Sequence, residues 1–563
     1  MTSRRSILGG ALSLAATGYS KSQTNHGTSP LSSSGFLDLL RVPDYAAVYS
    51  SDTLVPLSLS GNRWSAAGVA VHLAPSSAGL PIRLTADNFA PIRIHLRWHS
   101  AITGNPLLLG DAWERSYGEL AWRSIVPERV MPWYFLAYDG SAVHGYGVQT
   151  QASALCFWQL DADGVSLWLD VSNGGAGVQL RGRELLAARV ITRQGSADEK
   201  PMEAATAFCR SLCPKPRLTY SPLYGSNDWY YAYGKNSAAQ TLRDAALVAD
   251  LSRDNKVRPF TVIDMGWENG PPTFPDMPDL ARQIKSHQVR PGLWIRPLEA
   301  PKNTAPNLLL PGARFGKRSE RAHELSFDPT IPEALNSVIA KVKNPASWGY
   351  ELIKHDFSTY DLLGKWGNEM GPTPVSPGWN FQDRSRTNAE VTLALYQALR
   401  QAAGDGVLLT GCNTIGHLSA GIFESQRTGD DTSGREWERT RRMGVNTIAF
   451  RLPQNNTFFT LDPDCVGITP AIPWDLNRQW LDLIASSGAA LFISPDPSAT
   501  GKLQQEAIRQ AFSVAAAGNI GASPENWFRD STPEAWTVSR KGERSAARRY
   551  NWSGPAGCSP FAV

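Results

Sequence analysis

Between residues 223 and 496 the sequence alternates short apolar runs with segments of helical periodicity. This alternation predicts a parallel sheet covered by helices, and eight strand–helix units over about 250 residues are the size of a (β/α)8 barrel. A doubly wound open sheet is the alternative, but no glycine-rich phosphate-binding sequence follows any of the strands. The expected strands are residues 223–234, 259–267, 291–300, 350–357, 406–414, 421–431, 446–452 and 489–496. The expected helices are residues 237–253, 278–287, 331–342, 388–402, 436–444 and 476–488.

The regions on either side of the predicted barrel have a different pattern of apolar and polar residues. From residue 37 to residue 191, short runs alternate apolar and polar residues between Gly, Asn and Asp, which predicts an antiparallel β-sandwich. After Thr500 a helix leads to a short β appendage. The predicted fold is therefore multidomain: an N-terminal antiparallel β-sandwich, a central (β/α)8 TIM barrel and a short C-terminal β appendage. The predicted boundaries are 1–35 for an export signal and polar linker, 36–215 for the sandwich, 216–505 for the barrel, and 506–563 for the C-terminal helix and appendage.

The N-terminal residues are typical of a processing signal. Arg4 and Arg5 precede a moderately apolar run at residues 7–16, and a polar tract follows at residues 20–34. This arrangement resembles a twin-arginine export signal, so we expect a bacterial protein that is exported to the periplasm or outside the cell. The apolar run is too short to span a bilayer, and no later segment is a better candidate.

Composition narrows the classes of partner. The net charge of +4 and the lack of a dense Lys/Arg run give no reason to expect nucleic-acid binding. The 19 Trp and 16 Tyr residues could pack against sugar rings or lie in the core. Cys209 and Cys213 share a helix face and could form a disulfide or simply pack, and no second Cys or His pair completes a zinc site. We expect no metal and no cofactor, and the sequence leaves the oligomeric state open.

Polar residues end several of the predicted strands. The active site of a barrel lies at the carboxyl ends of its strands, so these side chains should face one concavity. A salt-bridged strand end would explain any one of them, and a ring of carboxylates could bind a metal, but the cations Lys354 and Arg427 disfavour a metal site. The residues are Asp264, Asp356, Cys412, Asn413, Arg427, Asp430, Asp431, Asp462 and Asp464.

In order and spacing, these motifs resemble those of the melibiase group of retaining α-galactosidases. Residues 354–356, Lys-His-Asp, are similar to the Lys-x-Asp that carries the nucleophile of this group, and residues 427–431 are similar to its Arg-x-x-x-Asp acid/base element. Residues 263–267, 292–299 and 461–467 resemble three further motifs of the group, and the likeness covers roughly residues 223–497. The resemblance implies that Asp356 is the nucleophile and that Asp431 is the acid/base, with Asp430 as the alternative.

The resemblance also implies a set of substrate-binding residues. Lys354 should keep Asp356 charged, and Asp264 should accept a sugar hydroxyl unless it pairs with Arg296 instead. The tryptophans are either sugar platforms or core residues, and Cys412 is either a substrate contact or a packed or disulfide-bonded cysteine. The candidates are Trp229, Asp264, Trp267, Trp294, Arg296, Lys354, Cys412 and Arg427.

Two departures from the family pattern bear on the substrate. Met265 follows Asp264 where the family has a second aspartate, and Arg296 stands where the family has a carboxylate. The predicted function is an exported α-galactosidase-like hydrolase that cleaves terminal α-linked sugars of an oligosaccharide or polysaccharide through a covalent glycosyl-enzyme. One alternative is a shifted specificity for an α-N-acetylgalactosaminide, a β-L-arabinopyranoside or an acidic sugar, which an arginine could grip. The other is a non-catalytic carbohydrate-binding protein.

Overall fold

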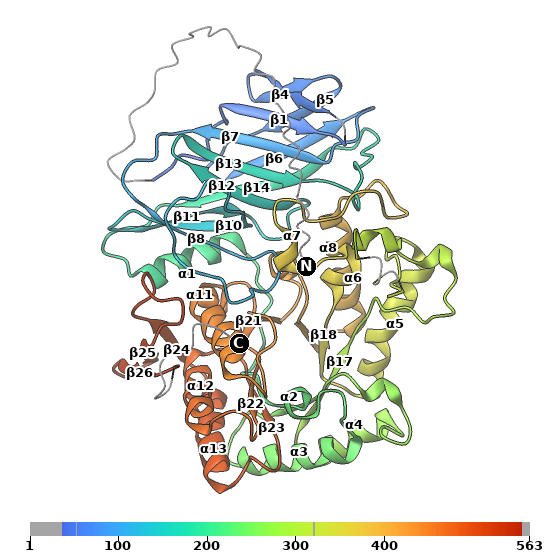
Figure 1. The fold of residues 1–563 in the computed structure, drawn as a ribbon, viewed down its shortest axis with the longest axis vertical. Coiled ribbons are helices and arrows are strands. Elements are labelled where there is room, and N and C mark those ends of the chain that lie inside the picture. The colour runs from blue at the N-terminus through green and yellow to red at the C-terminus, as the bar shows by residue number, and fades with distance from the viewer. Residues whose placement is uncertain (1–35, 52, 319–320, 322, 554–563) are drawn as a thin grey trace, which may run out of the picture.

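The N-terminal part of the protein contains two antiparallel sheets. The structure, a computed structural model, describes residues 36–51, 53–318, 321 and 323–553, so the predicted export signal and Cys558 lie outside the described residues. The strands are β1 (Tyr45–Tyr49), β2 (Leu54–Pro56), β3 (Ser58–Ser60), β4 (Arg63–Ala66), β5 (Val69–Leu73), β6 (Leu80–Ala86), β7 (Arg93–His99), β8 (Leu107–Gly110), β9 (Met131–Pro132), β10 (Tyr134–Tyr138), β11 (Val143–Val148), β12 (Leu155–Asp161), β13 (Gly164–Asp170) and β14 (Leu185–Arg193). Their orders are β2-β1-β7-β13-β12-β9 and β3-β4-β5-β6-β14-β11-β10-β8. Figure 1 shows them together at one end of the molecule.

Alternating side chains explain these sheets. In β7, Ile94, Leu96 and Trp98 are buried while the residues between them are more exposed, which is the period of a strand with one face on the core. Helix α1 (Pro201–Leu212) follows the sandwich and presents Phe208 to β11, where the ring lies against Gly145. Cys209 and Cys213 are both buried and free, so packing, not a disulfide, accounts for the pair.

The second half of the described chain forms a parallel sheet. Its strands are β15 (Tyr224–Asn227), β16 (Phe260–Ile263), β17 (Arg290–Ile295), β18 (Leu352–His355), β19 (Leu408–Gly411), β20 (Ser425–Arg427), β21 (Thr460–Asp462), β22 (Cys465–Ile468) and β23 (Leu491–Pro495). The order is β21-β20-β19-β18-β17-β16-β15-β23-β22, and the ladders between its neighbours are parallel. Only Pro463 and Asp464 separate β21 from β22. The two ends of the sheet are therefore consecutive in the chain, which is the topology of an eight-unit barrel with an interrupted seventh strand.

The seventh strand was predicted in the wrong place. Residues 446–452 lie in a helical stretch, a π-helix over Arg441–Asn446 followed by α11 (Thr447–Arg451), and β21 and β22 supply the strand instead. The run is short and apolar, and such runs do not distinguish a buried strand from a buried helix by periodicity. At Asp464 the backbone has φ of +71°, a left-handed conformation at the break between the two half-strands.

Helices cover the parallel sheet. Figure 1 shows α3, α4, α5, α12 and α13 around the outside of the strands, and α8 between the barrel and the antiparallel sheets. The amphipathic pattern of α4 buries Leu280, Ala281 and Ile284 and leaves its polar face outside. The helices between the strands are α2 (Trp229–Ala232), α3 (Ala238–Leu251), α4 (Met277–Ser286), α5 (Pro332–Trp348), α6 (Ser358–Leu363), α7 (Gly367–Met370), α8 (Asn388–Ala403), α9 (Gly416–Ser419), α10 (Trp437–Thr440) and α12 (Trp474–Ser487).

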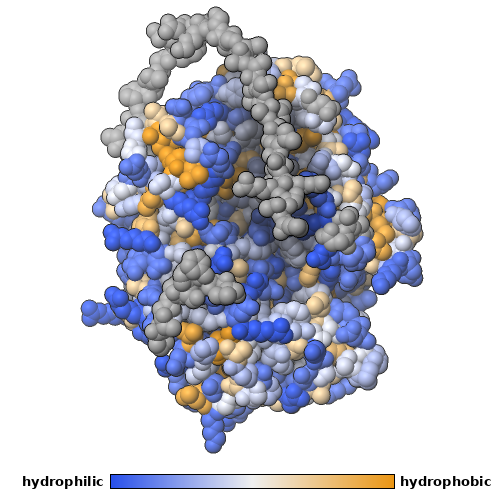
Figure 2. Space-filling model, viewed as in Figure 1, coloured by the Kyte–Doolittle hydropathy of each residue, from blue (hydrophilic) through white to orange (hydrophobic). Residues whose placement is uncertain are grey.

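The C-terminal part is small. Helix α13 (Lys502–Ala517) packs against α12, so the predicted boundary between residues 505 and 506 falls inside a barrel-covering helix. An antiparallel sheet of β24 (Ile520–Pro524), β25 (Ala535–Arg540) and β26 (Ala546–Arg549) follows this helix, in the region where a β appendage was predicted. On the face in Figure 2 the surface is mainly hydrophilic, with separate hydrophobic patches. Among the described helices, none is both long enough and apolar enough to cross a membrane.

Candidate active site

Asp356 follows β18 directly, and three donors hold its carboxylate. The indole Nε1 of Trp294 donates to Oδ2 at 3.0 Å, and the backbone N–H groups of Phe357 and Asn413 donate to Oδ1 at 2.8 and 3.1 Å. Burial raises the pKa of Asp356, but the charges of Arg115 and Lys354 outweigh burial and leave it below its usual value. Asp356 is therefore an ionised carboxylate in a fixed orientation at the end of a barrel strand.

Asp431 lies beside two guanidinium groups. Its Oδ1 is 3.3 Å from Nη2 of Arg427 and 3.6 Å from Nη1 of Arg115, and its side chain is 39% exposed. Burial raises its pKa, but Arg427, Arg115 and Lys354 together lower it to about 2. A lowered pKa is opposite to what a carboxyl group needs if it is to be protonated at the start of a reaction.

Asp430 has both carboxylate oxygens occupied. Its Oδ1 is 2.7 Å from Nη2 of Arg115, and its Oδ2 is 2.7 Å from Nη2 of Arg439. A carboxylate between two arginines has little freedom to approach a substrate. Of the two neighbouring aspartates, Asp431 is the more exposed.

Asp264 and Lys354 form a buried pair. Nζ of Lys354 is 2.7 Å from Oδ2 of Asp264, which also accepts from Nδ2 of Asn227 at 2.7 Å. The predicted alternative partner of Asp264, Arg296, binds elsewhere. Lys354 thus pairs with Asp264, and its charge also favours the ionised form of Asp356 by lowering the pKa of that group.

Arg296 is bound by carboxylates of its own region. Its Nε and Nη2 donate to Asp361 at 3.0 and 2.6 Å, and Nη2 also donates to Glu324 at 3.1 Å. The guanidinium lies 4.4 Å from the centre of the Phe357 ring. Asp361 is therefore the structural partner of Arg296. Because its guanidinium is occupied in this way, Arg296 has no free fork for an anionic sugar.

The three candidate tryptophans have different roles in the fold. Trp294 is buried and orients Asp356 through its indole N–H. The indole of Trp267 donates to the backbone oxygen of Trp294 at 2.8 Å, so Trp267 supports the same strand. Trp229 is half-buried, and its ring is tilted against Tyr233 at 5.6 Å between centroids. Partial exposure leaves Trp267 and Trp229 as the two that can still offer a ring face.

Cys412 is a free, buried thiol between two cations. Its Sγ accepts from Nη1 of Arg427 at 3.3 Å and from Nη1 of Arg115 at 3.5 Å. Arg427 is fully buried, and Nη2 also contacts Asp464 at 2.8 Å. Asn413, the next residue, donates its backbone N–H to Asp356, and Arg427, which donates to Cys412, also contacts Asp431. The neighbours of Cys412 therefore contact both candidate catalytic carboxylates.

Sequence reasoning missed Arg115. It belongs to the N-terminal part of the chain, and no barrel motif points to residues 113–116. A charged pair, Glu114 and Arg115, beside a tryptophan in a sandwich region was the available signal, because charges there need partners if they are buried. His355 hydrogen-bonds to Ser358 through Nε2 and packs against Tyr396 and Phe423. His417 contacts the backbone oxygen of Val148 at 2.8 Å.

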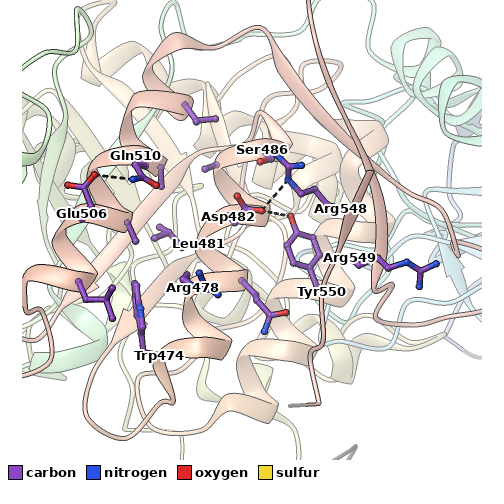
Figure 3. Close-up of a pocket in the computed structure, with 16 residues that line it drawn as sticks. Trp474, Arg478, Leu481, Asp482, Ser486, Glu506, Gln510, Arg548, Arg549 and Tyr550 are labelled. Atoms are coloured by element: carbon purple, nitrogen blue, oxygen red, sulfur yellow. Dashed lines mark hydrogen bonds and ion pairs between the residues drawn. The ribbon is translucent and has the colours of Figure 1, made fainter. Parts of the chain in front are cut away.

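A groove on the described surface is lined by residues other than the candidate site residues. Figure 3 shows a groove between α12, α13 and β26, where Asp482 contacts Tyr550 at 2.8 Å and Arg548 at 3.9 Å. Glu506 contacts Gln510 at 3.0 Å, and of the described residues that line this groove none is a strand-end carboxylate of the barrel. Among the residues that the structure describes, no group of three or more His, Cys, Asp or Glu side chains could hold a metal ion.

Several solved structures with a similar fold are α-galactosidases. An α-galactosidase from Thermus thermophilus, TtGalA, is 17% identical with a TM-score of 0.57, over 85% of this chain and 96% of that chain. The GH36 α-galactosidase AgaA from Geobacillus stearothermophilus is 12% identical with a TM-score of 0.57, over 89% of this chain and 80% of that one. An α-galactosidase from Lactobacillus brevis is 12% identical with a TM-score of 0.57, over 90% and 74%.

Sequence comparisons add nothing to this likeness. No protein-family model matches the chain, and no curated protein sequence matches it. The likeness to the α-galactosidases is therefore a likeness of fold that extends over most of both chains, from the antiparallel sheets through the barrel. It agrees with the resemblance seen in the strand-end motifs.

Proposed function

We propose that this protein is a retaining glycoside hydrolase of the α-galactosidase type, which removes terminal α-linked sugars by double displacement. The observation that carries the proposal is the fixed, ionised carboxylate of Asp356 at a barrel strand end, in the same charge network as Asp431. The fold supports it, because TtGalA was solved with p-nitrophenyl α-D-galactopyranoside and with stachyose, and an AgaA variant was solved with raffinose. Galactose is the default sugar.

In the first step, Asp356 attacks the anomeric carbon. Trp294 and two backbone N–H groups orient it, and its lowered pKa keeps it ionised and nucleophilic at neutral pH. The bond to the leaving oxygen breaks as the bond from Asp356 forms, and Asp431 gives its proton to that oxygen. Water, deprotonated by Asp431, then cleaves the glycosyl-enzyme and restores both carboxyl groups.

Asp431 must gain a proton before the first step. In the empty site its pKa of about 2 leaves it ionised, which is the form needed for the second step. A sugar that covers the exposed side of Asp431 removes water from it, and loss of water favours the neutral carboxyl. We therefore propose that substrate binding raises the pKa of Asp431, so that Asp431 takes up its proton in the enzyme–substrate complex.

A glycoside panel tests the proposed activity. We expect hydrolysis of p-nitrophenyl α-D-galactopyranoside in preference to the corresponding uronide, because Arg296 is already bound by Asp361 and Glu324. The panel also includes the N-acetylgalactosaminide and the arabinopyranoside, which test a shifted specificity. Asp356→Asn should lose at least about 10³-fold in kcat, since it lacks the nucleophile. Asp405→Asn is the matched control and should retain activity, because Asp405 is an exposed carboxylate that precedes β19 and does not lie at the carboxyl end of a strand.

The stereochemistry of the first product tests the mechanism separately from the substrate. Double displacement releases the α-anomer, which proton NMR detects before mutarotation. A β-anomer would show that no covalent intermediate forms. Full activity in Asp356→Asn would remove Asp356 from the mechanism, and binding of oligosaccharides without any hydrolysis would identify a carbohydrate-binding protein.

We further propose export to the periplasm or the cell exterior, supported by the Arg4–Arg5 pair and the apolar run that follows it. Replacement of both arginines by lysine should leave the full-length chain in the cytoplasm. Fractionation of cells that express the full chain measures this, and unchanged export of the variant would contradict the assignment.

A further inference from the structure

A loop of the N-terminal part reaches the acid/base segment of the barrel. We call residues 111–119 the strap. The backbone N–H of Ser116 donates to the oxygen of Thr428 at 3.0 Å, and the N–H of Asp430 donates to the oxygen of Ser116 at 2.8 Å. Ser116 and Gly429 thus form an isolated parallel β-bridge, so the strap binds the backbone of the segment that carries Asp430 and Asp431.

The flanking strap residues fix the strap on the barrel. Asp111 pairs with Arg451 at 2.9 Å, and both side chains are buried. Glu114 is fully buried and accepts from Nδ2 of Asn413 at 2.5 Å and from the N–H of Gly367 at 3.1 Å. Arg115 is therefore held between two anchors that both contact the barrel.

Arg115 itself contacts three groups around the site. Its Nη2 is 2.7 Å from Asp430, its Nη1 is 3.6 Å from Asp431, and the same Nη1 is 3.5 Å from Sγ of Cys412. Its side chain is only 7% exposed. A buried guanidinium without carboxylate partners would be strongly destabilising, so the tandem aspartates and Arg115 require one another.

The geometry points to Arg115 as the positioning residue of the acid/base: by binding Oδ1 of Asp430 through Nη2, it commits one carboxylate of the tandem pair to structure and leaves the other, Asp431, as the more exposed carboxylate of the pair. This inference rests on the proposed function, because it requires Asp431 to be the acid/base. Arg115 acts through the aspartates, and no contact between Arg115 and the reacting atoms is needed.

The charges around Asp431 determine what the loss of Arg115 should do. Arg427, Arg115, Lys354 and Arg439 lower the pKa of Asp431, and Asp356 and Tyr230 are its acidic neighbours. Arg115 also lowers the pKa of Asp356. Removing its charge should therefore raise both pKa values, whereas removing the negative charge of Asp430 should lower that of Asp431 and leave Arg115 free to approach it.

The experiment compares Arg115→Gln, Arg115→Lys and Asp430→Asn with the wild type in the full chain. For Arg115→Gln we expect both limbs of the pH profile of kcat, which reports groups in the enzyme–substrate complex, to move to higher pH by about one unit, with a loss in kcat of about 10²-fold. Arg115→Lys should retain most of the pH profile but not all of the rate, because a lysine keeps the charge and loses the fork. Asp430→Asn should move the profile to lower pH.

Shifts of the pH profile in opposite directions in the two variants distinguish a positioning role of Arg115 from a general loosening of the site. A merely structural role would make Arg115→Gln and Asp430→Asn change in the same way, since each breaks the same ion pair. Arg123→Gln is the control, because the Arg123 side chain is exposed and donates to the backbone oxygen of Glu119, and among the described residues it forms no ion pair with Asp430 or Asp431. Thermal melting of every variant separates loss of fold from loss of rate.

Carboxyl carbon NMR of aspartate-labelled protein reads the titration of Asp431 without turnover, with Asp431→Asn to assign the signal. An Asp431 pKa that rises in Arg115→Gln and falls in Asp430→Asn supports the inference even if no glycoside is cleaved, in which case only the proposed function fails. Unchanged titration in both variants, or shifts in one direction, would overturn the inference while leaving an active wild type as a glycosidase.

Discussion

Asp228 is a buried carboxyl group behind the candidate site. Its Oδ1 accepts from the N–H of Asp264 at 2.9 Å and its Oδ2 accepts from Asn236 at 3.0 Å. Burial, and then the charge of Asp264, raise the pKa of Asp228 from its ordinary 3.8 to about 8. The folded protein therefore keeps a neutral carboxyl here at pH values where the unfolded chain has an ionised one.

The sign of the resulting pH dependence follows from proton binding. Between about pH 4 and pH 8 the folded state holds a proton that the unfolded state has released, so Asp228 makes stability fall as pH rises. Asp228→Asn removes this dependence, which changes the free energy of unfolding by up to about 1.4 kcal/mol per pH unit. We expect the variant to gain melting temperature relative to wild type as pH rises through this window. Asp254→Asn, an exposed aspartate, is the control, and a constant difference across pH would contradict the assignment.

At the scale of single residues, the sequence predicted those whose neighbours are set by the barrel itself. Asp264, Lys354 and Asp356 meet because strand ends of a parallel sheet share one rim. Arg115 could not be predicted, because its place depends on how a sandwich loop docks on the barrel. The partner of Arg296 was missed for a similar reason, since Asp361 lies on the helix after the strand and not at a strand end.

Helix α8 begins with a capping box that can be tested alone. The Thr387 side chain accepts from the N–H of Glu390 at 3.0 Å, and the Glu390 side chain accepts from the N–H of Thr387 at 2.9 Å. Thr387→Ala should lower the free energy of unfolding by about 1 kcal/mol, because it leaves helix donors unpaired. Thr387→Ser keeps the hydroxyl and should lose much less.

Denaturant unfolding of the two variants measures the cap. Their kcat values should match that of the wild type, because Thr387 contacts Ser153 and its own helix and no candidate site residue. Equal stability of the alanine and serine variants would show that the hydroxyl contributes nothing.

At the scale of elements, long periodic segments were predictable and short apolar ones were not. The helix at residues 388–402 was found because its apolar residues repeat over several turns and a cap precedes it. The run at residues 446–452 carries no such repeat, and it continues a helix begun by a π-helical turn. The seventh strand escaped because Pro463 and Asp464 divide it into pieces of three and four residues.

At the scale of the whole molecule, a buried ion pair joins the antiparallel sheets to the barrel. Arg451 of α11 donates to both oxygens of Asp111 in the strap, at 2.9 and 3.1 Å, and its guanidinium also donates to the backbone oxygens of Thr428 and Glu114 at 2.8 Å each. In Figure 1, α11 lies below the antiparallel sheets, with α1 between them. The guanidinium of Arg451 thus contacts two residues of the strap, Asp111 and Glu114, and one residue of the acid/base segment, Thr428.

We therefore expect the two parts to unfold together, and Arg451→Met to be costly. The variant leaves the Asp111 carboxylate buried without its cation, which costs about 3–5 kcal/mol. The double variant Asp111→Asn, Arg451→Met removes both charges and should recover part of that loss, since no uncompensated charge remains. Scanning calorimetry measures both effects. If the double variant lost as much stability as Asp111→Asn and Arg451→Met together, the two residues would not be coupled. Two separate unfolding transitions in the wild type would show that the sheets and the barrel do not depend on each other for stability.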